Sequence, residues 1–305
     1  EALKNDGITP SLANGDYDLL QWDTTRYTNW QKELIGGTAH ISDGQIGVSG
    51  GTSNTQFLAG AGFHREGAVF QGNYADQKIS AHLNLNHISE NQRLSITISS
   101  SYIDDHNNLP NYDVTSRALT LAPDAPALYD QNGNLNWEGS TWVNPLSYLN
   151  QIYTADTKNL IANSIVSYRL LKGLKIKANL GYTNLQMEEF STNPLSSLNP
   201  AYPNQTASAS ESNSSYNTWI IEPQVEYRTN FKKGKLNLLI GSSFQQSMNN
   251  LQTVNGSGYT SDALLGNFLA APFINILASA DNQYKYTSFY GRINYSLDEK
   301  YLVNI

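Results

Sequence analysis

The chain has 305 residues, a formal net charge of −7 and only 19 Lys and Arg. It therefore lacks the basic field that holds a phosphate backbone, and nucleic acid is not expected as a partner. It has no cysteine, which excludes a disulfide framework and thiolate metal sites. Tyrosine (19) outnumbers phenylalanine (9) and only 15% of residues are charged, a composition typical of strands and polar loops.

Apolar runs are short throughout the chain. Because a spanning helix needs a continuous apolar run of about 18 residues or more, no transmembrane helix is expected. The nearest approach, residues 264–280, is interrupted by Asn267, Pro272 and Asn275 and predicts one or two short helices within a loop. The start shows no signal peptide and the end, YLVNI, resembles the first residues of a strand, so we expect a piece of a longer protein.

A period of two residues predicts strands along most of the chain. In the clearest segment, Leu174 to Thr183, apolar residues alternate with lysine, asparagine and threonine. The remaining predicted strands cover residues 37–49, 55–67, 80–87, 93–102, 159–170, 218–228, 236–245 and 288–297, with a last one beginning at 301.

Short and long connections alternate between these strands. Tight turns are predicted at 50–54, 89–92, 171–173, 230–234 and 298–300, and the longest loops at 104–157, 190–215 and 252–283. An up-and-down antiparallel sheet would therefore place all its tight turns at one rim and all its long loops at the other.

These features together indicate a transmembrane β-barrel, with strands of roughly ten residues, one apolar face and short turns opposite long loops. Tyr168, Tyr227, Tyr295 and Tyr301 lie near the tight-turn rim, where an interfacial aromatic girdle belongs. The alternative is a soluble β-sandwich, whose strands average about five or six residues and whose hairpins need not be short at one end.

In a barrel, the polar face of each strand would line the lumen. The interior would then be either wet or filled by a polar plug. The residues expected on this face include Asn179, Gln224, Glu226, Arg228 and Arg292.

Six segments of the sequence form a combination of motifs. They are YTNWQKELIGGTAH (27–40), VSGGTSNTQF (48–57), NNLPNYDVT (107–115), LTLAPDAPALYDQNGNLNWE (119–138), NPLSYL (144–149) and LIANSIVSYRLLKGLKIKANLGYTNLQ (160–186). Together these motifs are specific, and they resemble the SusC/RagA family of TonB-dependent outer-membrane transporters of Bacteroidetes. The resemblance covers essentially the whole chain.

The resemblance implies an all-β, antiparallel up-and-down transmembrane β-barrel of roughly 22 strands with a plugged lumen, of which this chain would be about half. Residues 1–36 would be an extracellular loop segment and residues 37–305 a barrel segment of about ten strands, the last truncated. The plug and the N-terminal extension would be absent. The tight turns would be periplasmic and the long loops extracellular.

The resemblance also implies a function without catalysis or cofactor. Such proteins import nutrients through the Gram-negative outer membrane. Glycans or oligosaccharides are the expected cargo, and peptides are the alternative. They work with a SusD-like surface lipoprotein and with the TonB complex, which would contact the missing N-terminal part. A soluble all-β binding or adhesion module is the competing function.

Four aromatic residues in the longest loop are the candidate contacts for ligand or partner. Tyr129, Trp137, Trp142 and Tyr148 could stack on sugar rings, because an aromatic face is flat and apolar. The alternative is that they hold a large loop to itself and to its neighbours.

Three patterns that suggest other chemistry fail on closer reading. Ser49 in GVSGG fits G-x-S-x-G, but a second strand follows instead of a helix, so the glycines predict a hairpin and no catalytic residue is assigned. The five histidines lack metal-ligand spacing. The loop Asp130 to Asn134 lacks a calcium spacing, and Asn132-Gly133 predicts a small hairpin between Tyr129 and Trp137. No metal is predicted.

Overall fold

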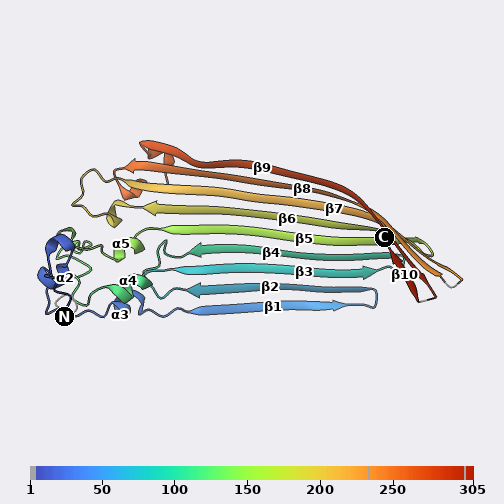
Figure 1. Cartoon of the computed structure of the whole chain (residues 1–305), viewed down its shortest axis with the longest axis horizontal. Coiled ribbons are helices and arrows are strands. Elements are labelled where there is room, and N and C mark those ends of the chain that lie inside the picture. Colours follow the sequence, from blue (N-terminus) through green and yellow to red (C-terminus); the bar gives the residue numbers. More distant parts are fainter. Residues whose placement is uncertain (1–4, 233, 299) are drawn as a thin grey trace.

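A computed structural model describes residues 5–232, 234–298 and 300–305, which form one ten-stranded antiparallel sheet in the order β1 to β10 (Figure 1). The all-β, up-and-down prediction is confirmed. The strands are β1 (Ile41–Gly51), β2 (Thr55–Gly67), β3 (Ala75–Ile88), β4 (Leu94–Asn108), β5 (Tyr153–Leu171), β6 (Leu174–Asn193), β7 (Ala207–Phe231), β8 (Gly234–Tyr259), β9 (Phe273–Leu297) and β10 (Tyr301–Asn304).

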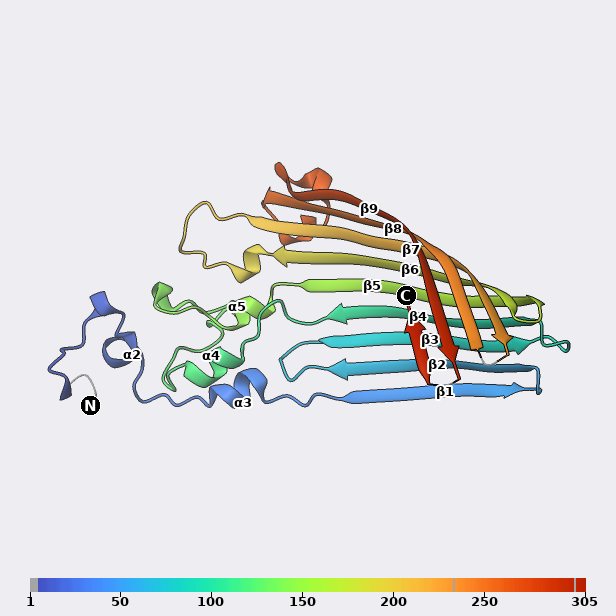
Figure 2. The same ribbon diagram turned by 45° about the vertical axis from the view of Figure 1, so that its right-hand side comes forward.

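Short helices lie in the connections. They are η1 (Leu12–Asn14), α2 (Tyr17–Leu20), α3 (Trp30–Ile35), α4 (Thr115–Thr120), η2 (Glu138–Ser140), α5 (Leu146–Leu149), η3 (Leu195–Ser197), η4 (Asp262–Leu264) and η5 (Phe268–Ala270). They gather at the loop end of the sheet, opposite the tight turns (Figures 1 and 2). Within the described ranges, no helix is both long enough and apolar enough to cross a membrane.

The strands extend further toward the loop rim than the apolar alternation indicates. β7 and β9 have 25 residues each and β8 has 26, so much of the predicted loops 190–215 and 252–283 is strand. Residues 264–280 were predicted as helices within a loop; η4 and η5 are there, but β9 begins at Phe273. The prediction was wrong from that point because a strand is held by ladder hydrogen bonds, which continue after the apolar period ends.

The tight turns lie at one rim, as predicted. After β1 the backbone N–H of Thr52 donates to the carbonyl of Thr55 at 2.6 Å. Gly51 has a φ of 148°, and a Cβ there would clash with the same carbonyl. Ser49 lies within β1 opposite Leu58, so only the last glycine of GVSGG serves the chain reversal.

An apolar band crosses one face of the sheet. One row of ladder partners joins Leu94, Tyr168, Ile176 and Val225, and the row at the band's other edge joins Tyr102 to Leu160. From Leu160 to Tyr168 the band extends roughly 26 Å along β5 at about 3.3 Å per residue. Tilted by about 40°, this length spans roughly 20 Å, close to the apolar band of an outer-membrane barrel, which is about 25 Å tall.

The same face becomes polar beyond this band. On the loop side, Asp156 and Lys158 continue the outward positions of β5, and His106 Nδ1 lies 2.7 Å from Asp156 Oδ1. Side chains inside the band stay uncovered by protein: Ile240 is 71% exposed and Phe289 81%. Leaving such a surface bare in water is costly, so this face favours an apolar environment over water.

Buried apolar side chains concentrate in the loops rather than under the sheet. The larger cluster lies at the loop end of the sheet and combines α3, α4, α5 and the loop between α4 and α5; we call it the loop lobe. Its buried members are Trp30, Leu34, Val114, Ala118, Ala125, Trp142 and Leu146. A smaller cluster surrounds Tyr259 at the end of β8.

The apolar band predicts which positions tolerate charge. Leu180 lies within the band between Ser164 and Ile221, whereas Thr183 lies on the opposite face. In the full-length protein refolded into lipid vesicles, Leu180→Arg should lower the free energy of unfolding by about 2–4 kcal/mol. Thr183→Arg is the matched control and should change it far less. Urea titration measures both, and equal losses would contradict the assignment of faces.

Candidate functional site

The loop lobe is a packed structure built around two tryptophans. The rings of Trp30 and Trp142 have centroids 6.0 Å apart and planes inclined at 48°. Both indole N–H groups donate to backbone carbonyls: Trp30 to Ala122 at 2.8 Å and Trp142 to Asn136 at 3.0 Å. Because the rings are buried and their polar ends are satisfied, the lobe presents a fixed outer surface.

The four aromatic candidates occupy different environments in this lobe. Tyr129 is 52% exposed, whereas Trp142 is only 7% exposed and belongs to the core. Trp137 and Tyr148 are partly buried. The Tyr148 ring lies 5.1 Å from that of Tyr112 and under the guanidinium of Arg117 at 5.9 Å. A contact role for the four stays a prediction, and Tyr129 offers the most free surface.

The hairpin predicted at Asn132-Gly133 is present. Tyr129 pairs with Leu135 in a single bridge, and Gly133 has a φ of 81°. The Asp130 carboxylate accepts backbone hydrogen bonds from Asn132 and Asn134, each at 2.8 Å. These bonds, that from Asn134 above all, hold the pKa of Asp130 below its ordinary value. The carboxylate thus closes the loop; Trp137, expected to flank this hairpin, follows after the bridge.

One residue that organises the lobe was missed from the sequence. Asn144 is fully buried, and its amide donates to the carbonyls of Leu128 at 2.6 Å and Asn136 at 3.0 Å. Its side-chain oxygen accepts the N–H of Leu146 at 3.0 Å. The Asn144-Pro145 pair, a turn signal, was the only sequence sign of it.

The face opposite the apolar band carries a hydrogen-bonded polar network. Glu222 accepts from Ser243 at 2.9 Å and from Asn179 at 3.2 Å, and Gln224 donates to the hydroxyl of Tyr290 at 2.9 Å. The polar residues predicted to share one face do so, since Glu226 and Arg292 are linked through consecutive ladder partners. This face is suited to water or to a polar protein surface.

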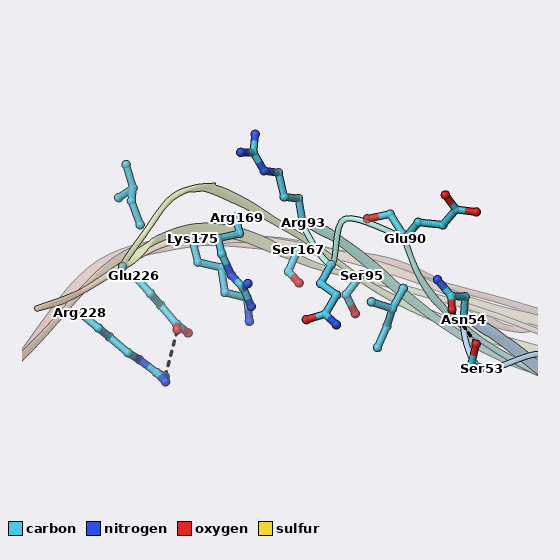
Figure 3. Close-up of a pocket in the computed structure, with 15 residues that line it drawn as sticks. Ser53, Asn54, Glu90, Arg93, Ser95, Ser167, Arg169, Lys175, Glu226 and Arg228 are labelled. Atoms are coloured by element: carbon cyan, nitrogen blue, oxygen red, sulfur yellow. Dashed lines mark hydrogen bonds and ion pairs between the residues drawn. The ribbon is translucent and has the colours of Figure 1, made fainter.

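A groove of about 710 Å³ opens at the tight-turn end of the sheet. We call it the basic groove, because Arg93, Arg169, Lys175 and Arg228 line it against two carboxylates, Glu90 and Glu226. Arg169, Lys175, Glu226 and Arg228 point to the concave side of the curved sheet (Figure 3). Arg228 Nη2 lies 3.3 Å from Glu226 Oε2. The groove could not be predicted from the sequence, because it forms only where several tight turns and strand ends of the sheet come together.

The β5–β6 turn helps to position the groove. Gly173 has a φ of 87°, and its carbonyl accepts the N–H of Arg228 at 2.8 Å. A Cβ on Gly173 would overlap the carbonyl of Arg228. The glycine therefore lets the turn lie directly against β7.

Curated proteins with a similar sequence include two from Formosa agariphila. TonB-dependent receptor P26 is 25% identical over 285 residues and TonB-dependent receptor P3 is 25% identical over 292. Each match covers 90% of this chain and 28% of the relative, so the chain spans about a quarter of their length. No family model matches the chain.

Solved structures show the same fold. The RagAB peptide importer in its "closed-closed" state superimposes with a TM-score of 0.71 at 21% identity, covering 93% of this chain and 33% of that one. Its "open-open" state gives 0.70 at 20% identity, covering 95% and 34%. The chain is SusC/RagA-like. The resemblance predicted from the sequence is confirmed, and these relatives are receptors and transporters rather than enzymes, as expected.

The buried position of Trp142 predicts a structural role in the SusC/RagA-like lobe. Trp142→Ala should remove about 3–5 kcal/mol of packing free energy and loosen the loop. In the full-length receptor, limited proteolysis should then cut faster between residues 109 and 152. Tyr27→Ala is the control, because Tyr27 is 81% exposed. Equal cleavage of both variants would contradict the core assignment.

The Gly173 turn supports a second prediction for the SusC/RagA-like sheet. Gly173→Ala should destabilise it by about 1–2 kcal/mol, because a left-handed conformation is strained for an L side chain. The clash with Arg228 adds to this cost. Gly44→Ala is the control, since a Cβ there meets nothing within 4 Å. Urea unfolding in lipid measures both, and an unaffected Gly173 variant would contradict the strain.

Proposed function

We propose that this chain forms part of the barrel wall of an outer-membrane, TonB-dependent nutrient importer. The observation that carries the proposal is the apolar band, confined to one face of a wholly antiparallel sheet and backed by a polar opposite face. Water suits only one of these faces. A soluble sandwich would bury the apolar face against a second sheet, and the described residues supply none.

In this proposal the two rims face different compartments. The loop lobe and the long strand extensions lie outside the cell, and the tight turns lie in the periplasm. Residues 1–36 then belong to an extracellular loop and residues 37–305 to the barrel. Since the chain covers 28% of its curated relatives, a plug and a TonB-contacting segment belong to polypeptide beyond these residues.

The proposed partner at the loop rim is a SusD-like surface lipoprotein. The RagAB structures, described as "open-open" and "closed-closed", support a two-component assembly as the model for this pairing. Tyr129, Tyr112 and Tyr27 are each at least half exposed near the lobe. Large aromatic side chains of this kind contribute strongly to protein interfaces.

Oligosaccharide is the proposed cargo, because exposed tyrosines at the loop rim can stack on sugar rings. Peptide is the second candidate, favoured by the description of RagAB as a peptide importer. Both require ligand capture at the loop rim and energy delivered from the periplasmic side.

The proposal is tested in the full-length receptor by replacing the exposed Tyr129 and the partly buried Trp137. Tyr129→Ala with Trp137→Ala should weaken lipoprotein binding or cargo uptake roughly two- to tenfold, the effect of losing aromatic contacts of about 0.5–1.5 kcal/mol. Tyr202→Ala, an exposed tyrosine in another loop, is the control. Uptake is measured with labelled oligosaccharides and peptides, with and without TonB. Uptake that does not depend on TonB would contradict the proposed import mechanism. Unchanged lipoprotein binding and cargo uptake in the Tyr129→Ala, Trp137→Ala variant would contradict a contact role for these two residues.

A further inference from the structure

A small pocket opens at the loop end of the sheet, on the face opposite the apolar band. Its volume is about 280 Å³, and β6, β7 and β8 line it together with both ends of the loop that joins β4 to β5. Ser191 lies opposite Ser210 and Ser210 lies opposite Asn255, on the face that carries Asn179 and Glu222. In the proposed barrel this face lines the lumen, so the pocket lies just inside the outer mouth.

The side chains that line this pocket are uncharged throughout the part of the chain that the structure describes; we call it the uncharged pocket. Apart from Tyr112 and Ala209, all of them are amides or hydroxyls. Among the described residues, the side chains of Asn111, Ser191 and Ser208 have no hydrogen-bond partner. The pocket therefore offers free donors and acceptors without a charge.

Tyr112 supplies the aromatic wall of the uncharged pocket. It is 50% exposed, and its ring centroid lies 5.1 Å from that of Tyr148 with the planes inclined at 56°. Tyr148 is held in turn by the guanidinium of Arg117, which lies over its ring. The Tyr112 ring is thus braced by a neighbour while half of its surface stays open. An open aromatic face is flat and apolar, as the C–H side of a sugar ring requires.

The strands around the pocket disfavour a peptide or an acidic ligand. β6, β7 and β8 are each paired on both sides, so they offer no free backbone edge to which a peptide could add as a strand. A charged peptide terminus would find no counter-charge in the lining. Glu189 lies on the same face two residues from Ser191, and its carboxylate, which accepts the hydroxyl of Tyr153 at 2.7 Å, repels anions.

We infer that the uncharged pocket binds a neutral sugar unit of the cargo, with the sugar ring on Tyr112 and its hydroxyls hydrogen-bonded to Asn111 and Ser208. This assignment rests on the proposed function and deepens it, because it specifies the charge of the cargo and a contact inside the mouth of the barrel. The volume suits a single sugar unit, since sites for larger, drug-sized ligands span roughly 300–1,000 Å³. Sugar hydroxyls both donate and accept, as do the hydroxyls and amides of the lining.

Isothermal titration calorimetry of the full-length receptor in detergent tests the assignment. The probes are neutral hexasaccharides of glucose, mannose, galactose and xylose, compared with hexagalacturonate and hexa-alanine. A neutral hexasaccharide should bind, and roughly tenfold more tightly than hexagalacturonate. Failure of all the neutral probes to bind would overturn the assignment. So would tighter binding of hexagalacturonate or hexa-alanine.

Matched variants show whether the neutral probe binds in the pocket. Tyr112→Ala should weaken its binding roughly three- to tenfold, whereas Tyr112→Phe, which keeps the ring, should bind within about twofold of wild type. Tyr202→Ala is the control, because Tyr202 is 58% exposed in another loop and lies outside the pocket lining. Wild-type affinity in Tyr112→Ala would overturn the assignment.

An added cation provides a readout that a merely structural role would not move. Asn111 is exposed in the loop, so Asn111→Lys should fold normally. The new ammonium should raise the affinity for hexagalacturonate, relative to the neutral probe, by roughly threefold or more. An unchanged ratio of the two affinities would overturn the placement of the ligand in this pocket.

Uptake by cells separates this assignment from the proposed function. If a neutral probe binds through Tyr112 but cells show no TonB-dependent uptake, the proposed function fails and the sugar pocket stands. If TonB-dependent uptake is normal and no neutral probe binds, the sugar pocket fails and the proposed function stands.

Discussion

The structure depends on one constraint: in a hydrocarbon environment, every backbone N–H and C=O must be paired within the protein. The uninterrupted antiparallel ladder from β1 to β10 meets this requirement across all the described strands. The outer edge of β1 has no neighbour within them, so the described sheet is one wall of a barrel and not a closed one. Such an edge is open to pairing with further strands, and the curated relatives are several times longer than this chain.

The same constraint explains where stabilising contacts lie. A sheet with lipid on one side and a lumen on the other has no conventional core, and its apolar side chains are left uncovered by protein. Buried side chains are concentrated at the loop rim instead. There, Trp30, Trp142 and Asn144 belong to a compact lobe in which their polar groups are hydrogen-bonded. The lobe forms a compact surface at the loop rim, while the face opposite the apolar band remains polar.

The face opposite the apolar band carries different charge clusters at its two rims. Near the loop rim, Lys78 lies among acidic side chains, 3.0 Å from Asp105 and 3.8 Å from Asp76. At the tight-turn rim, Arg169 and Lys175 lie opposite each other, and neither has a carboxylate partner among the described residues. Neither arrangement is visible in the net charge, because each depends on the ladder register that places side chains of consecutive strands opposite each other.

The sequence by itself determined the strand order, the polarity of the two faces and the rim of the tight turns. It could do so because a period of two residues and positive-φ glycines such as Gly51 are local properties. It could not show how far β7, β8 and β9 extend, since ladder pairing maintains a strand after its apolar pattern stops. It also could not show which aromatic side chains of the long loop are buried, as Trp142 is, and which are exposed, as Tyr129 is. Only the tertiary structure decided these points, and the basic groove with them, because burial and charge clustering depend on the ladder register and on how the loops pack.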